Sequence, residues 1–179
     1  MAYKRHYLKE YRTKQELWNI ALHEAAHAVV AYKLGKKVKH ISITPEDMGD
    51  GEASGWCAYF PSKNKDDYVA SLVGTIAGIV YETGGKPFID FIREEKEFPW
   101  LIGTDEPCDW GTIIWEYNKI KEAEKEQGLP VSKGSIILQS YILADRIMKK
   151  NKRLIRKVAR TLLEKKYLRS KQFLAVVEG

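Results

Sequence analysis

Residues 13–35 read TKQELWNIALHEAAHAVVAYKLG, and this stretch has the features of one helix with defined ends. Thr13 followed by Glu16 fits a capping box, in which each side chain binds the backbone N–H of the other residue. Apolar residues then recur at helical spacing, and Gly35 can adopt the left-handed conformation that ends many helices. The sequence therefore predicts a helix over about residues 14–34.

The centre of this helix carries an HExxH motif formed by His23, Glu24 and His27. Two histidines four positions apart lie about 40° from each other on one helical face, so both imidazoles can reach a single ion. Neutral imidazole suits zinc, and a catalytic zinc site keeps a position open for water. The motif predicts Zn²⁺ held by His23 and His27, with Glu24 as the general base that deprotonates the zinc-bound water.

A third protein ligand is required, and the residue types leave Glu82, Asp105 and Asp109 as candidates. Each has another interpretation: Glu82 as an outer partner of a ligand imidazole or a surface acid at a helix end, Asp105 as a solvated turn residue, and Asp109 as a helix N-cap. Cys108 lies beside Asp109, but a thiolate suits a closed structural site better than a catalytic one. His6 and His40 lack partners at ligand spacing.

The remaining sequence predicts a small antiparallel sheet and several further helices. Strands are expected over Val38–Thr44 and Gly55–Phe60, separated by turn-forming residues. Residues 86–108 are expected to form a long loop with a short helix near Ile89–Lys96. Helical patterns cover Asp66–Thr83, Asp109–Gln127, Lys133–Lys150, Lys152–Lys166 and about Lys171–Val177.

These elements predict an α+β fold that is mostly α-helical, with a zincin-like HExxH helix beside a small antiparallel sheet. We expect one domain over residues 1–179, because a chain of 179 residues is short for two cores. Within it, residues 13–128 would form the zinc-binding core and residues 129–179 a C-terminal helical bundle.

The composition predicts a cytoplasmic protein. Hydrophobic residues make up 44% and charged residues 30%, which is typical of soluble globular chains. The longest uncharged apolar stretch, Val69–Tyr81, is shorter than the roughly 20 residues that cross a bilayer. No apolar segment follows the basic residues of Met1–Arg12, so no secretory signal is expected. Cys57 and Cys108 form no recognisable disulfide framework and are expected to be reduced.

The net charge of +6 is concentrated near the C-terminus. Lys149–Lys171 contains eleven Lys or Arg residues and one acid, Glu164. Apolar residues alternate with these charges at amphipathic spacing, which favours the solvated face of a helix. Binding of nucleic acid or another acidic partner is the alternative, and it predicts an affinity that falls steeply with salt.

Residues 21–45, ALHEAAHAVVAYKLGKKVKHISITP, resemble the peptidase domain of the FtsH family of ATP-dependent zinc metalloproteases. In that family a similar helix is followed by an edge strand and a second, glycine-containing strand, for which Gly55–Tyr59 stands here. Thr75–Glu82, TIAGIVYE, is similar to the family's buried helix that ends in a glutamate. The family's glycine pair and arginine are not reproduced, and Ala26 stands where the family usually has glycine.

The resemblance continues to about Val177. Gly103–Asp109 takes the place of the family's Thr-Thr-Gly-Ala-x-Asn-Asp segment, although the family's consecutive Thr, Gly and Ala residues are not present in it. The last aspartate of that segment is the family's third zinc ligand, which implies this role for Asp109. Residues 140–168, SYILADRIMKKNKRLIRKVARTLLEKKYL, resemble the family's C-terminal helical pair.

The motif and the resemblance together imply a zinc-dependent endopeptidase that hydrolyses unfolded or flexible polypeptides. The sequence has no GxxxxGK[ST] phosphate loop and no candidate membrane span, so we expect neither an ATP site nor membrane segments. A separate unfolding partner could then supply substrate. The resemblance does not imply the family's hexamer for this chain. The alternative is a non-catalytic, zinc-stabilised protein that binds a partner or nucleic acid through its basic C-terminal helices. Glu24 counts against it, because a structural site needs no general base.

Overall fold

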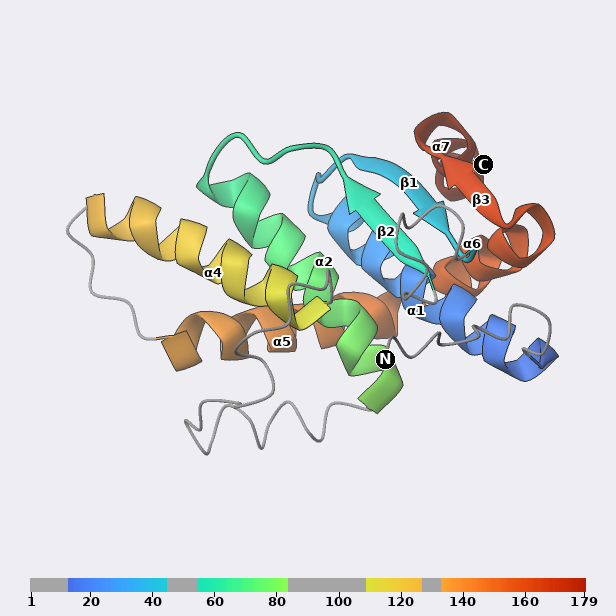
Figure 1. Ribbon diagram of the computed structural model, residues 1–179, viewed down its shortest axis with the longest axis horizontal. Helices are drawn as coiled ribbons and strands as arrows, with labels where there is room; N and C mark the ends of the chain where they lie inside the picture. Colours follow the sequence, from blue (N-terminus) through green and yellow to red (C-terminus); the bar gives the residue numbers. More distant parts are fainter. Residues whose placement is uncertain (1–12, 45–54, 84–108, 127–132) are drawn as a thin grey trace, which may run out of the picture.

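The computed structural model describes residues 13–44, 55–83, 109–126 and 133–179 (Figure 1). The fold is mostly helical with one small antiparallel sheet, as the sequence predicts. Its elements in chain order are α1 (Lys14–Lys33), β1 (Val38–Ser42), β2 (Trp56–Tyr59), α2 (Lys65–Thr83), α4 (Asp109–Glu126), α5 (Lys133–Lys150), α6 (Lys152–Lys165), β3 (Tyr167–Arg169) and α7 (Ser170–Glu178). The short helix predicted near Ile89–Lys96 lies outside the described residues.

Helix α1 begins and ends where its capping residues predict. The Thr13 hydroxyl accepts a hydrogen bond from the Glu16 N–H at 3.2 Å, and the Thr13 N–H donates to the Glu16 carboxylate at 2.6 Å. At the other end Gly35 has a φ of 84°, a conformation that glycine adopts without steric cost. From Ala21 to Ala31 every residue is buried except His23, which is partly exposed. The second half of α1 therefore runs through the core and carries the HExxH motif into it.

The sheet has the strand order β2-β1-β3, with both pairings antiparallel. Ile41 of β1 faces Cys57 of β2 on one side and Leu168 of β3 on the other. The resembling family has an edge strand after its helix, whereas β1 is the central strand of the sheet described here. The pattern could not reveal β3, which has three residues and a single buried one, Leu168, within a basic segment.

Two groups of helices flank α1 (Figure 1). Helices α2, α4 and α5 pack together on one side of α1. Helices α6 and α7 lie together near β3, the strand at the opposite edge of the sheet from β2. Residues 70–80 of α2 are all buried, so this helix lies between its neighbours instead of on the surface. One hydrophobic cluster joins residues of α1, α2 and α4 with residues of α5, α6 and α7.

Helix α6 is amphipathic, as the basic segment predicts. Ile155, Val158, Ala159 and Leu162 are buried, whereas the Lys and Arg residues between them are exposed. The helix ends at Lys165, and the left-handed φ of 62° at the following residue, Lys166, turns the chain into β3. Among the described residues, no helix is long and apolar enough to cross a membrane.

The C-terminal helix α7 is part of the core through Phe173, and this gives a stability prediction. Phe173 is fully buried, and its ring meets that of Tyr32 in α1 edge to face, with centroids 5.7 Å apart. Phe173→Ala should lower the free energy of unfolding by about 3–5 kcal/mol, because it leaves a cavity in the core. Urea denaturation measures this change. Phe60→Ala, at a residue that is 43% exposed, is the matched control and should cost less than about 1 kcal/mol.

Candidate metal centre

Three side chains from α1 and α4 converge at one point between these helices. The Nε2 atoms of His23 and His27 are 2.8 Å apart. The Oδ2 atom of Asp109 lies 3.0 Å from the first and 3.2 Å from the second. One turn of α1 brings the two histidines together, whereas Asp109 arrives from the first turn of α4, 86 residues from His23 in the chain. The structure thus brings together the two motif histidines and one of the three candidate acids.

The orientation of His27 is fixed by a backbone group of α2. Its Nδ1 atom lies 2.9 Å from the carbonyl oxygen of Gly74. A carbonyl oxygen only accepts hydrogen bonds, so Nδ1 carries the proton and donates it. In the neutral ring the Nε2 lone pair then points toward His23 and Asp109, which is the tautomer that a metal ligand requires.

Asp109 and the histidines shift each other's protonation. Burial on its own raises the pKa of Asp109, but the charge of His27 and the hydrogen bonds that both imidazoles donate in their protonated form outweigh it and hold that pKa below its ordinary value. Burial lowers the pKa of His27, and here the Asp109 carboxylate outweighs it, so this pKa lies above its ordinary value. The ionised Asp109 carboxylate therefore favours a positive charge, such as a proton or a cation, at the point where the three side chains meet.

The donor set of this cluster fits a zinc ion. Two imidazole nitrogens and one carboxylate oxygen are ligand types that zinc accepts, and three protein ligands leave a fourth position for water or substrate. The ligand atoms of His23, His27 and Asp109 all lie within 4.8 Å of one another. Among the described residues, these three form the group of at least three His, Cys, Asp or Glu side chains that could hold a metal ion.

Glu24 is buried next to this cluster, against the start of β2. It is 5% exposed and lines the same cavity as His27 and Asp109. A β-carbon on Gly55 would lie 2.6 Å from the Glu24 Oε1 atom, so the missing side chain of Gly55 leaves the room that this carboxylate occupies. Gly55, the residue just before β2, is therefore part of the site.

Gly78 of α2 lies directly over the two histidines. A β-carbon built there would overlap the His27 ring and would lie 2.8 Å from the Nε2 atom of His23. A β-carbon on Gly74, one turn earlier, would lie 2.7 Å from the Tyr59 hydroxyl oxygen and 2.8 Å from the Ala31 β-carbon. Sequence reasoning missed this role of Gly78. The available signal was a pair of glycines four residues apart inside an otherwise apolar helix, which usually marks close packing.

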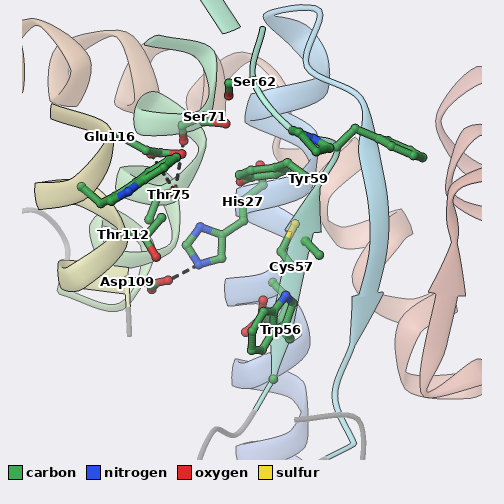
Figure 2. A pocket seen from close by; sticks show the side chains of 16 residues that line it. His27, Trp56, Cys57, Tyr59, Ser62, Ser71, Thr75, Asp109, Thr112 and Glu116 are labelled. Carbon is green, nitrogen blue, oxygen red and sulfur yellow. Dashed lines mark hydrogen bonds and ion pairs between the residues drawn. The ribbon is translucent and has the colours of Figure 1, made fainter. Parts of the chain in front are cut away.

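A cavity of about 330 Å³ opens beside the cluster (Figure 2). Figure 2 shows Ser71, Thr75 and Glu116 gathered on one side of it, with Thr112 and Asp109 next to them, Tyr59, Cys57 and Trp56 on the other side, and His27 between the two groups. Sequence reasoning missed Glu116, a buried carboxyl on α4. Burial raises its pKa to about 8, although a hydrogen bond with Ser71 and the charge of Lys36 act in the opposite direction.

The other candidates are placed only in part. Glu82 belongs to the last turn of α2, but its side chain lies outside the described residues, as do Asp105, Cys108 and His6. His40 is a residue of β1 and stacks on Tyr167 of β3, with ring centroids 5.3 Å apart. It is thus a strand histidine.

The close contact at Gly78 gives a test of the site. Gly78→Ala should reduce zinc content to below about half of the wild-type value, because the new methyl group displaces the His27 ring, and should destabilise the fold by about 1–3 kcal/mol. Elemental analysis and urea denaturation measure the two effects. Gly74→Ala is the comparison variant, since its methyl group would meet Tyr59 and Ala31 instead. It should destabilise similarly with a smaller loss of zinc, and equal zinc losses in both variants would contradict the specific role of Gly78.

Comparison with known proteins shows a relation to one group of proteases. No protein-family model matches the chain. It is 40% identical over 87 residues to the ATP-dependent zinc metalloprotease FtsH of Mycoplasma mobile and 42% identical over 88 residues to that of Mycoplasmopsis synoviae. Each match covers 48% of this chain and 12% of the relative. The FtsH of Caldicellulosiruptor bescii is 28% identical over 92% of this chain and 30% of its own length. The chain is thus related in sequence to FtsH metalloproteases while spanning less than a third of each of these three.

Proposed function

We propose that this protein is a zinc-dependent endopeptidase that hydrolyses unfolded or flexible polypeptides. His23, His27 and Asp109 hold the zinc ion, and Glu24 is the general base. The observation that carries the proposal is the convergence of the three ligand atoms beside a cavity that Glu24 also lines. The similarity to zinc metalloproteases named FtsH supports it.

The residues of the chain have distinct roles in this proposal. A bound zinc ion would polarise the scissile carbonyl and acidify the attacking water. Glu24 accepts the proton from that water and delivers it to the leaving amine, so one carboxylate serves both steps. The hydrogen bond from His27 to the Gly74 carbonyl keeps the ring in the ligating tautomer. Gly55 keeps the space in which the Glu24 carboxylate lies.

The sheet supports an extended substrate. Strand β2 is an edge strand in the described sheet, and its residues Trp56–Tyr59 line the cavity beside Glu24. An extended peptide that adds to such an edge forms main-chain hydrogen bonds with it, which aligns a peptide carbonyl with the metal centre. This binding mode requires a segment without folded structure. A folded substrate would therefore need a separate unfolding partner, a role compatible with the ATP dependence in the relatives' names.

The proposal is tested by measuring zinc content and casein cleavage on one set of variants. Wild type should contain close to one zinc ion per chain, and His23→Ala and Asp109→Ala should lose it because each removes a ligand. Glu24→Gln should keep zinc while cleavage falls by at least about 100-fold, since the proton acceptor is lost. His40→Ala is the matched control for histidine removal and should retain both zinc and cleavage.

The outcomes separate the alternatives. Zinc retained in Asp109→Ala would move the third ligand to another acid. Wild-type protein that binds zinc but cleaves neither casein nor flexible peptides would favour a non-catalytic, zinc-stabilised protein. Wild-type protein without zinc after expression and dialysis in zinc-containing buffer would refute the proposed centre.

A further inference from the structure

The cavity beside the metal centre contains a buried carboxyl that the proposed hydrolysis does not use. Glu116 of α4 is 3% exposed, and it lines the cavity together with Ser71 and Thr75 of α2. The Thr75 hydroxyl lies 3.5 Å from its Oε2 atom, and Ser71 also hydrogen-bonds it. Within the described part of the chain, Glu116 forms no ion pair with a basic side chain. A buried carboxyl can carry its negative charge at low cost only when a cation pairs with it.

The charged groups around the cavity are predominantly acidic. Its described lining contains the carboxyls of Glu24, Asp109 and Glu116 and the imidazole of His27, but no Lys or Arg. Two of these carboxylates face the proposed metal centre, whose divalent ion would balance them. Lys36 acts on Glu116 from outside the lining, where its ammonium group donates a hydrogen bond to Ser62 at 2.6 Å. Glu116 is therefore the lining carboxyl still available to a cation.

The walls of the cavity suit a long basic side chain. Trp56, Tyr59, Phe60 and Trp115 contribute aromatic rings to the lining. The ring of Trp115 is held edge to face against Tyr68, with centroids 5.8 Å apart. Aromatic faces attract ammonium and guanidinium groups and pack against the methylene stem that carries them. The cavity thus combines aromatic walls with a buried carboxyl and two buried hydroxyls.

We propose that this cavity is a specificity subsite that binds a Lys or Arg side chain of the substrate, next to the bond that is cleaved, with Glu116 as its counter-ion. Its position relative to the cleaved bond rests on the proposed peptidase function. When no ligand is bound, burial raises the pKa of Glu116 to about 8. A cation that binds beside this carboxyl would favour its ionised form, because an opposite charge nearby lowers the pKa of an acid. A neutral side chain of the same shape gains neither effect.

Binding to a catalytically inactive protein tests the subsite independently of cleavage. The parent is zinc-loaded full-length protein with Glu24→Gln, and the probes are fluorescent peptides in which arginine or its neutral isostere citrulline occupies each position in turn. At one position the arginine peptide should bind at least about 10-fold more tightly than the citrulline peptide. Adding Glu116→Gln should reduce this ratio to below about 2-fold. Glu122→Gln, an exposed glutamate on the same helix, is the matched control and should leave the 10-fold ratio in place.

Cleavage by the wild type gives the second readout. Mass spectrometry of casein fragments should show Lys and Arg enriched at one position beside the cleaved bond. Equal affinities of the two peptides, no binding of either, or a ratio that survives Glu116→Gln would overturn the subsite. Cleavage without a basic preference would overturn the subsite while leaving the peptidase function intact. A Glu116-dependent preference in binding, with no cleavage by wild type, would instead retain the basic pocket and refute the peptidase function.

Discussion

The close approach of α2 to α1 is the constraint on which the site depends. Gly78 leaves space for the His27 ring, and Gly74 supplies the carbonyl oxygen that orients it. Each glycine in a helix interior costs about 1 kcal/mol relative to alanine. The packing of two largely buried helices offsets that cost, because the same contact buries the apolar residues around the glycines. One helix interface thus stabilises the core and fixes a buried imidazole in a single tautomer.

The sheet connects this interface to the C-terminal segment. Strand β1 holds β2 on one side, where Gly55 and Cys57 lie near Glu24, and β3 on the other. Helix α6 packs on α1 and leads into β3, so the basic C-terminal region supports the central strand β1 and contributes no residue to the described lining of the cavity. With β3 covering one side of β1, the edge that faces the cavity belongs to β2. The unpaired backbone of an edge strand is where an extended segment can bind.

Short-range patterns predicted the parts of the fold that depend on neighbouring residues. The capping box of α1, the HExxH spacing and the apolar run of α2 all act within a few turns of helix. No local pattern brings Asp109 to the histidines, so the residue types leave it as one of three candidates. Only the resemblance points to Asp109 among them. The contacts of Gly78 and Glu116 arise from how α2, α4 and β2 meet. Strand β3 was missed because three residues with one buried side chain give no detectable alternation.

Glu116 departs from the pattern of its own helix, and this departure fits the proposed specificity. Ile113, Glu116 and Ile120 recur at helical spacing and are all buried, so an apolar residue is expected at the middle position. Local rules of this kind are broken mainly at functional sites. Glu116 follows Asp109 by seven positions, which places their α-carbons about 10 Å apart along α4. A substrate side chain that starts near the metal centre must therefore be long to reach the Glu116 carboxyl, and this distance favours Lys or Arg over a short polar residue.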